Sequence, residues 1–366
     1  MKEIYFDNAS TALPIESQSN CSYGNPSTTH VLGVKAYNAL EQARKDLAQI
    51  LGCDKDEVVL TSGGTESNNL AIIGYAIAHK RKGVRYAALP WAHPSVTLAM
   101  KHAVGQGLAT EASELVCAEA EISFAEGANF TSIPQVCHET GNKYDVEKIS
   151  FCLKKSSQKN IVHVDGAQGF CKEKLNLKNI DLYSFSGHKI HAPAGTGGLM
   201  VKKGVRLSAL FFGGGQEAGL RAGTQNVQGA ASLALAAKKL HKNMDENSAA
   251  VLVVKSELLK LTEDLSDVHI NAAQKSSPYI LNMSFIGAKG EVLANMLSEK
   301  GIYVSTGAAC KVGKSEIPAL KLMGFGKEIA DSAVRFSFSP HNTVEEARLA
   351  REAVIECVAK LRGLRR

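Results

Sequence analysis

Short apolar runs alternate with longer helical patterns between residues 57 and 205, and this alternation constrains the fold more than any other feature of the chain. The runs that we expect to form strands are 57–62, 84–90, 114–119, 161–165, 182–186 and 197–203. Helical patterns occupy 65–80, 94–104 and 145–155. This order predicts an α/β domain with a mostly parallel sheet. Ligands of such sheets bind at the carboxyl ends of the strands, so polar residues that follow a strand are the first functional candidates.

A long helical stretch from about residue 230 to 264 contains no Pro or Gly and forms either one long helix or two in succession. After it, strand patterns at 279–285, 302–307 and 333–339 stand between helical patterns, which is typical of an α+β domain. The length of 366 residues is enough for two domains. We therefore expect the chain to pass through this stretch into a second, smaller domain.

Composition excludes several classes of partner. The net charge of +6 arises from 42 basic and 36 acidic residues that are scattered along the chain, which indicates a solvated surface rather than a nucleic-acid interface. The start of the chain, MKEIYFDNAS, lacks the apolar region of a signal peptide, and no apolar run approaches the roughly 18 residues of a membrane span. The eight cysteines form no C-x-x-C pair and no zinc-like spacing. We expect a cytoplasmic protein with reduced thiols and no membrane or metal partner.

Two Gly-rich segments are candidates for phosphate binding. In TSGGTESNN (61–69), Gly63 and Gly64 let the backbone approach a ligand, and the N–H groups of the helix start would bind an anion together with the Thr65 hydroxyl. The alternative is an ordinary Gly turn with a Thr cap. The second segment, GGGQEAGLRAGTQNV (213–227), is either a flexible loop or a further phosphate contact made by its backbone and Thr224.

Asp165 and Lys189 each stand at or after the end of a strand pattern. Downstream of a phosphate cradle, this pair supplies what pyridoxal phosphate requires. The Lys amine forms a Schiff base with the aldehyde, and the Asp carboxylate keeps the pyridine nitrogen protonated, so that the ring acts as an electron sink. His93, just after another strand pattern, would stack on the ring and move protons, or would be a helix-start His without a special role.

Arg335 lies within the apolar pattern VRFSFS (334–339), where a buried charge is costly unless it is paired. Its partner is either a substrate carboxylate, which a guanidinium binds in a bidentate manner, or a protein Asp or Glu. Cys310 follows five small residues in STGAAC, and considered alone it is a buried structural thiol.

Taken together, these segments resemble the cysteine desulfurases of the class V aminotransferase group, which supply sulfur for iron–sulfur clusters. The resemblance covers nearly the whole chain, in the family's order. The matching segments are YFDNAST, GNPSTTH, TSGGTESNNLAI, HVDGAQ, SFSGHKI, GGGQEAGLRAGT, STGAAC and VRFSFS. The resemblance implies fold type I of the pyridoxal-phosphate-dependent transferases, with a large α/β domain over 14–246 and a small α+β domain built from 1–13 and 247–366.

The resemblance also implies a role for each site residue. Lys189 would bind pyridoxal phosphate as a Schiff base, Asp165 would pair with the pyridine nitrogen, and Gln168 would hydrogen-bond the ring hydroxyl. His93 would stack on the ring and act in acid–base steps. The phosphate would be bound by Gly64, Thr65, Ser186, His188 and, from the neighbouring subunit of a homodimer, Thr224. Arg335 would hold the substrate α-carboxylate. Cys310 would take the sulfur of L-cysteine as a persulfide, leaving L-alanine, and an acceptor protein would collect the sulfur.

The chain departs from the family at two places. Cys137 and His138 replace two Asn residues that the family usually carries before Glu139, and we expect His138 to hydrogen-bond the cofactor ring oxygen or the substrate. The stretch between DNASTALP and YGNPS is also shorter than usual. The alternatives are another class V pyridoxal-phosphate enzyme, such as an aminotransferase or a selenocysteine lyase, and a non-catalytic scaffold.

Overall fold

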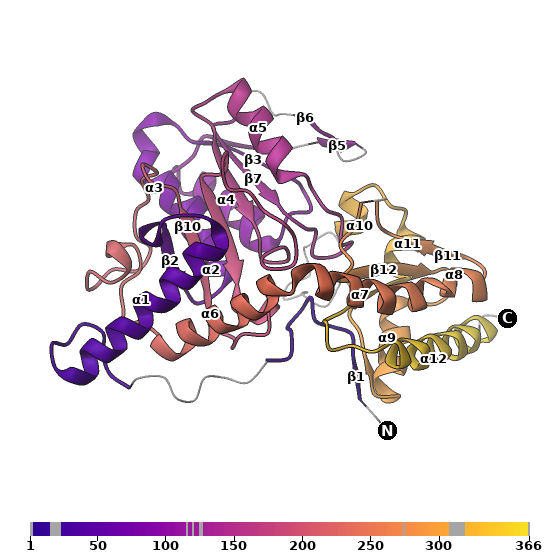
Figure 1. Ribbon diagram of the computed structural model, residues 1–366. Helices are drawn as coiled ribbons and strands as arrows, with labels where there is room; N and C mark the ends of the chain where they lie inside the picture. Colours follow the sequence, from indigo (N-terminus) through magenta and orange to yellow (C-terminus); the bar gives the residue numbers. More distant parts are fainter. Residues whose placement is uncertain are drawn as a thin grey trace. The chain divides into compact units, whose positions relative to one another are not determined.

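The computed structural model describes most of the chain (Figure 1). The described residues are 3–14, 23–114, 116–118, 121–123, 127–273, 275–306 and 319–364. The chain divides into two compact units. The larger unit comprises Leu13–Gln135 and Tyr144–Lys242, and the smaller comprises Met1–Ala12, Val136–Lys143 and Asn243–Arg366.

A seven-stranded sheet, ordered β2-β10-β9-β8-β7-β3-β4, forms the centre of the larger unit. Its strands are β2 (Val58–Thr61), β3 (Arg85–Ala88), β4 (Glu111–Glu114), β7 (Phe130–Pro134), β8 (Ile161–Asp165), β9 (Leu182–Ser186) and β10 (Gly197–Val201). The pairs from β9 to β4 are all parallel, whereas β10 is antiparallel to both of its neighbours. Strand β2 therefore points the same way as β9. The predicted mostly parallel α/β sheet is confirmed.

Two strands of this sheet were not anticipated from the sequence, namely β4 and β7. Strand β7 contains Thr131 and Ser132, which hide its apolar pattern although both side chains are buried. Ser132 Oγ lies 2.8 Å from His163 Nδ1 on the neighbouring strand, so its polar group is satisfied inside the core. The run expected at 114–119 contains the end of β4 and then β5 (Val116–Ala118), which pairs with β6 (Glu121–Ser123).

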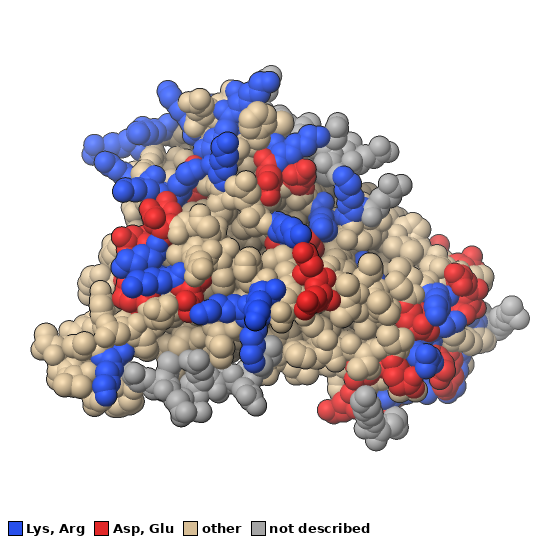
Figure 2. All heavy atoms as spheres, viewed as in Figure 1, with Lys and Arg blue, Asp and Glu red and all other residues tan. Residues whose placement is uncertain are grey.

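Helices flank the sheet of the larger unit. They are α1 (Val31–Leu51), α2 (Gly64–Asn69), the π-helical η2 (Leu70–Gly74), α3 (Tyr75–His79), α4 (Pro94–Gly105), α5 (Val146–Ser156) and α6 (Val227–Lys242). Short 3-10 turns are η1 (Lys55–Glu57), η3 (Lys80–Lys82), η4 (Gly187–Lys189) and η5 (Glu217–Gly219). Figure 1 shows α1 running beside α6, whereas α2 packs on β9 and β10. In Figure 2 Lys and Arg side chains gather over this unit. Helix α5 has Lys154 and Lys155 in its last turn.

The smaller unit is built around two small sheets. The three-stranded sheet β11-β12-β14 is antiparallel, and β1 pairs with β13 in parallel. These strands are β1 (Ile4–Tyr5), β11 (Val268–Ile270), β12 (Ile280–Phe285), β13 (Ile302–Tyr303) and β14 (Ala333–Ser337). Its helices are α7 (Met244–Leu259), α8 (Leu261–Asp264), α9 (Gly290–Glu299), α10 (Ala319–Leu322), α11 (Lys327–Asp331) and α12 (Val344–Gly363). The stretch 230–264 thus forms successive helices, with a break at Asn243.

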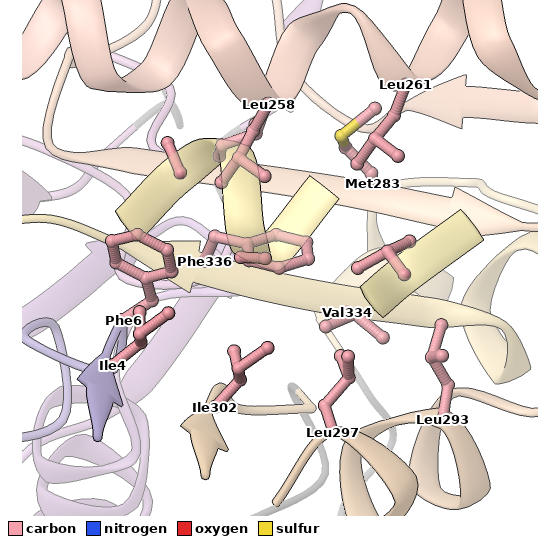
Figure 3. Close-up of a cluster of buried hydrophobic side chains, with 14 of the residues drawn as sticks. Ile4, Phe6, Leu258, Leu261, Met283, Leu293, Leu297, Ile302, Val334 and Phe336 are labelled. Carbon is pink, nitrogen blue, oxygen red and sulfur yellow. The ribbon is translucent and has the colours of Figure 1, made fainter. Parts of the chain in front are cut away.

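Figure 3 shows the core of this unit, in which Phe6 and Ile4 from the start of the chain pack among residues of the C-terminal part. Phe336 on β14 and Leu258 on α7 are fully buried in the same cluster. Helix α12 covers this core and begins at a capping box, because Thr343 Oγ1 accepts from Glu346 N at 3.2 Å and Glu346 Oε2 accepts from Thr343 N at 3.1 Å. Among the residues that the structure describes, no helix has the length and hydropathy of a membrane span.

Candidate active site

The predicted cofactor residues of the larger unit converge on one edge of its sheet. Strands β2, β3, β8 and β9 point the same way, so their carboxyl ends lie along the same edge. The TSGGT turn follows β2, His93 follows β3, Asp165 ends β8, and Lys189 closes the short turn η4 after β9. Positions that are distant in the sequence therefore line one edge because of the strand order.

Asp165 is buried and its carboxylate is held by two donors. Its Oδ1 accepts from Ala167 N at 3.0 Å, and its Oδ2 accepts from Asn68 Nδ2 at 3.0 Å. Asn68 lies on α2, four residues after Gly64, and its Nδ2 also donates to Ser95 Oγ at 2.8 Å. These two hydrogen bonds fix the orientation of the carboxylate. Asn68 belongs to the TSGGTESNN motif but was not among the residues predicted from the sequence.

His93 is joined to the same network through Ser95. Its Nδ1 accepts from Ser95 N at 3.2 Å, which makes His93 the N-cap of α4, with Pro94 in the first turn. Ser95 Oγ, which accepts from Asn68, lies 2.7 Å from the same Nδ1 and donates to it. Since Nδ1 is an acceptor, the proton of the neutral ring belongs on Nε2. The chain from Asp165 through Asn68 and Ser95 therefore sets both the orientation and the tautomer of His93.

The turn after β2 has the features of an anion cradle. Gly63 adopts φ 152°, which other residues rarely adopt, and it precedes the helix that starts at Gly64. The side chain of Ser186, at the end of β9, is buried, and its Oγ has no hydrogen-bond partner among the residues that the structure describes. A buried hydroxyl without a partner is costly, and a phosphate oxygen would satisfy it. Gly63 lies beside this hydroxyl, since a Cβ added at Gly63 would be 3.8 Å from it. The residues present thus fit a phosphate group.

Two lysines give this edge of the sheet positive charge. Lys189 lies in η4, and Lys172, in the turns after β8, is 6% exposed. Burial, assisted by the charge of Lys189, lowers the pKa of Lys172 to about 7. Burial and the same two lysine charges lower the pKa of His188 to about 4. An anion would relieve this repulsion, which agrees with the cradle. Lys172 was not singled out by the sequence analysis.

Gln168 is buried in the tight turn that follows Asp165. Gly169 N donates to Gly166 O in this turn at 2.9 Å. Gly166 has to be Gly, because an added Cβ would lie 2.0 Å from the Tyr183 ring. This close approach of β8 and β9 fixes where Gln168 leaves the sheet.

Thr224 is exposed at the end of the second Gly-rich segment. The segment is folded back on itself, since Phe211 and Arg221 form a backbone bridge and Gln216 Oε1 accepts from Gly223 N at 3.1 Å.

In the smaller unit, Arg335 on β14 is almost fully buried and already has several acceptors. Its Nη1 donates to His138 O at 2.7 Å, and its Nη2 donates to Asp7 Oδ1 at 3.1 Å and to Ser10 Oγ at 2.7 Å. Its Nε is buried and has no partner within the described part of the chain. The protein ion pair considered for this Arg thus exists, yet the Nε–H is left for a ligand.

His138 and Glu139 lie beside this guanidinium. The contact from His138 to Arg335 is made by the backbone carbonyl, whereas the imidazole Nε2 is 4.0 Å from Glu139 Oε1. Burial raises the pKa of Glu139 to about 7, and the charge of Arg335 opposes this rise. The contact of residue 138 with Arg335 thus uses the backbone and not the imidazole.

Cys310 lies outside the described residues, as do Lys311 and Lys314. The stretch that leads to Cys310 is described as far as Thr306. Ser305 pairs with Arg335, since Arg335 N donates to Ser305 O at 2.7 Å and Ser305 N donates to Arg335 O at 3.1 Å. The backbone of Arg335 thus anchors the start of this stretch within the smaller unit.

Known proteins resemble this chain over most of its length. The family model described as aminotransferase class-V matches residues 4–349. A NifS/IcsS protein homolog of Lactobacillus delbrueckii subsp. bulgaricus is 35% identical over 364 residues, which cover 94% of this chain and 94% of the relative. The cysteine desulfurase IscS of Buchnera aphidicola subsp. Schizaphis graminum is 34% identical, covering 93% of this chain and 87% of the relative.

Solved structures show the same similarity. A NifS-like protein superposes with a TM-score of 0.91 at 30% identity and covers 98% of this chain and 100% of its own. A structure described as SspA in complex with cysteine has a TM-score of 0.78 at 26% identity, covering 93% of this chain and 100% of its own.

Proposed function

The chain belongs to the aminotransferase class V family, and from this premise we propose that it is a pyridoxal-phosphate-dependent cysteine desulfurase that converts L-cysteine to L-alanine and transfers the sulfur to an acceptor. One observation carries the proposal in the larger unit. The end of β8 presents a carboxylate held by two donors. The end of the adjacent β9 carries, just before Lys189, a buried hydroxyl that no described residue pairs with. The similarity to SspA, solved in complex with cysteine, supports the substrate.

The cofactor would be held by residues on the edge of the larger unit's sheet. Lys189 would bind it as a Schiff base, Asp165 would pair with its pyridine nitrogen, and Gln168 would bond the ring hydroxyl. The proposed phosphate ligands are Gly64, Thr65, Ser186, His188 and, from a second subunit, Thr224. When bound, pyridoxal phosphate supplies an electron sink that weakens the bonds at the substrate α-carbon and β-carbon. The proposal thus includes a homodimer, in which Thr224 serves the partner's site.

The remaining steps fall to side chains of this chain. Arg335 would bind the substrate carboxylate with its Nε, which has no partner among the described residues, and His138 would contact the substrate or the cofactor. The Lys189 amine would move the α-proton. His93 would donate a proton from Nε2, the nitrogen that its network leaves protonated.

Cys310 would complete the reaction as a nucleophile. Its thiolate would attack the substrate sulfur, so that the carbon–sulfur bond breaks as a sulfur–sulfur bond forms. L-cysteine and the Cys310 thiol would then give L-alanine and a Cys310 persulfide, with no other oxidant or reductant consumed. An acceptor protein or a small thiol would take the terminal sulfur, in the manner of enzymes that serve iron–sulfur cluster assembly.

The test is a product assay with L-cysteine and a reducing thiol. We expect the purified holoenzyme to release alanine and sulfide in equal amounts, Cys310→Ala to release neither, and the control Cys152→Ala to match the wild type. A keto acid in place of alanine would indicate an aminotransferase. A Cys310→Ala variant that still eliminates selenium from L-selenocysteine but not sulfur from L-cysteine would indicate a selenocysteine lyase. Full desulfuration by Cys310→Ala would overturn the role of this thiol.

A further inference from the structure

A buried ion pair anchors the Gly-rich loop of residues 211–224, which we call the Thr224 loop, to the edge of the sheet. Glu217 accepts from Arg44 Nη1 and Nη2 at 2.7 and 2.8 Å, and its side chain is 1% exposed. Its Oε2 also accepts from Leu60 N at 2.8 Å, while Arg44 Nη1 donates to Val58 O at 2.6 Å. These two side chains therefore satisfy backbone groups of β2 along its free edge.

The backbone of the loop is strained at this anchor. Glu217 and the following Ala218 adopt φ of 50° and 54°, in the left-handed region that residues with a Cβ seldom occupy. Two consecutive residues keep this conformation only when contacts with the surrounding structure hold them in it. The anchor thus holds the loop at a fixed place beside the strand that leads into the phosphate cradle.

A second ion pair joins the loop to the cradle itself. Glu66, in the first turn of α2, accepts from Arg221 Nε at 3.1 Å through Oε1 and from Ser62 N at 2.9 Å through Oε2. Its side chain is 10% exposed, so this pair is shielded from solvent more than a surface pair. One carboxylate therefore bridges the turn that would bind the subunit's own phosphate and the loop that carries Thr224.

We propose that Glu66 and Arg221 are positioning residues. They hold Thr224, which would serve the partner's cofactor site, at a fixed place relative to the subunit's own phosphate cradle. Arg221 lies three residues before Thr224, and the intervening Gly223 is held by Gln216 within the same loop. A displacement of Arg221 therefore also moves Thr224. The inference rests on the proposed function, because it needs a cofactor phosphate and a homodimer. It predicts that a change at Glu66 or Arg221 in one subunit weakens cofactor binding at the site of the other.

Mixed dimers test this prediction. One subunit carries Lys189→Ala, which prevents the Schiff base, and is called blocked; the other keeps Lys189 and is called open. Two different affinity tags isolate dimers that contain one subunit of each kind. All Schiff-base absorbance then comes from the open site. The blocked subunit then also carries Arg221→Met, Glu66→Gln, Arg221→Lys or Thr224→Ala. Lys238→Met is the matched control, since it breaks the ion pair to Asp46 elsewhere in the larger unit. The rate of cofactor loss is followed by visible absorbance during competition with inorganic phosphate, and circular dichroism checks folding.

We expect Arg221→Met and Glu66→Gln in the blocked subunit to speed cofactor loss from the open site by about tenfold, the effect of losing one hydrogen bond to a charged group. Arg221→Lys should restore part of the affinity, and Lys238→Met should change nothing. One outcome is that Thr224→Ala in the blocked subunit weakens cofactor binding at the open site while Arg221→Met and Glu66→Gln do not. In that case the proposed role of Glu66 and Arg221, their coupling to Thr224, is wrong, and the site shared between subunits stands. If Thr224→Ala has no effect there, or no dimer forms, the shared site of the proposed function fails, and the coupling fails with it.

Discussion

Asn68 holds two groups of the candidate active site at once, because its amide nitrogen donates to both the Asp165 carboxylate and the Ser95 hydroxyl. A single side chain on α2 thereby fixes the carboxylate proposed for the pyridine nitrogen and, through Ser95, the tautomer of His93. A change at Asn68 tests the geometry of the site better than a change at His93, because no proposed chemical step uses Asn68.

We predict that Asn68→Ala lowers the free energy of unfolding by about 2 kcal/mol, because Asp165 loses a hydrogen bond to its charge inside the protein. The same change should speed cofactor loss by about tenfold. The matched control is Asn69→Ala, which removes a hydrogen bond from its Nδ2 to Thr65 O on the same helix and leaves Asp165 untouched. Urea unfolding and visible absorbance provide the two measurements, and equal effects of the two variants would contradict the role of Asn68.

Glu139 gives a prediction for pH dependence. Burial raises the pKa of this carboxyl to about 7 from an ordinary value of 4.5. The folded protein therefore holds this proton more tightly than the unfolded chain, so Glu139 favours the folded state most at low pH. That contribution is lost as pH rises through the folded-state pKa.

We expect the unfolding free energy of the wild type, measured relative to Glu139→Gln, to fall by about 2 kcal/mol between about pH 5 and pH 8. Comparing the two proteins removes the opposing effect of His163, whose pKa burial lowers to about 4. Denaturant titrations at several pH values supply the measurement. A difference that stays constant with pH would show that Glu139 is already ionised in the folded protein.

At the scale of elements, β8 and β9 bring the proposed cofactor residues together because a turn at Gly166 lets them pack closely. The register pairs Asp165 with Ser184, and the Tyr183 ring fills the space that a side chain at Gly166 would need. Tyr183 in turn donates to Gln135 Oε1 at 2.7 Å. The position of Gln168 thus depends on a contact between strands rather than on its own sequence.

Gly166→Ala should destabilise the fold by at least about 2 kcal/mol, because the added methyl overlaps the Tyr183 ring and forces the turn to shift. Gly105→Ala in α4 is the control, since a Cβ there meets nothing within 4 Å and Ala favours a helix. Thermal unfolding of both variants measures the difference. A Gly166→Ala protein as stable as the wild type would show that the turn relaxes freely.

The sequence pattern predicted most of these elements, and its failures have physical causes. The strands at 161–165 and 182–186 were predicted with their observed bounds, since both are continuous runs that end at polar turns. Strand β7 escaped prediction because its buried Thr131 and Ser132 are satisfied by partners on other elements, which no local pattern reveals. For the same reason, the links from Asn68 to Ser95 and from Glu66 to Arg221 appear only in three dimensions.

At the scale of the whole molecule, the chain leaves the larger unit once and returns. Val136–Lys143, which lies inside the range expected for the larger domain, groups with the smaller unit. Its ends pair with each other at Val136 and Lys143, and Asn282 Nδ2 on β12 donates to Glu139 O at 3.1 Å. A short segment without a change in composition carries no boundary signal, so the sequence could not predict this excursion.

The excursion places His138 and Glu139 beside Arg335 in the smaller unit, whereas the cofactor residues belong to the larger one. Sequence reasoning named residues of both groups through a family resemblance, and the class V family match supports that resemblance. The role of each residue remains a prediction. The proposed function depends most on Cys310, because a desulfurase needs a thiol that receives the sulfur.

The most direct measurement is therefore the mass of the Cys310 peptide after one turnover. The holoenzyme is mixed with an equal amount of L-cysteine labelled at sulfur, quenched with an alkylating agent, digested and analysed by mass spectrometry. The account predicts one labelled sulfur atom on the peptide that contains Cys310, alanine in matching amount, and no label on Cys53 or Cys152. Alanine formation without label on Cys310, or label on another cysteine, would contradict it.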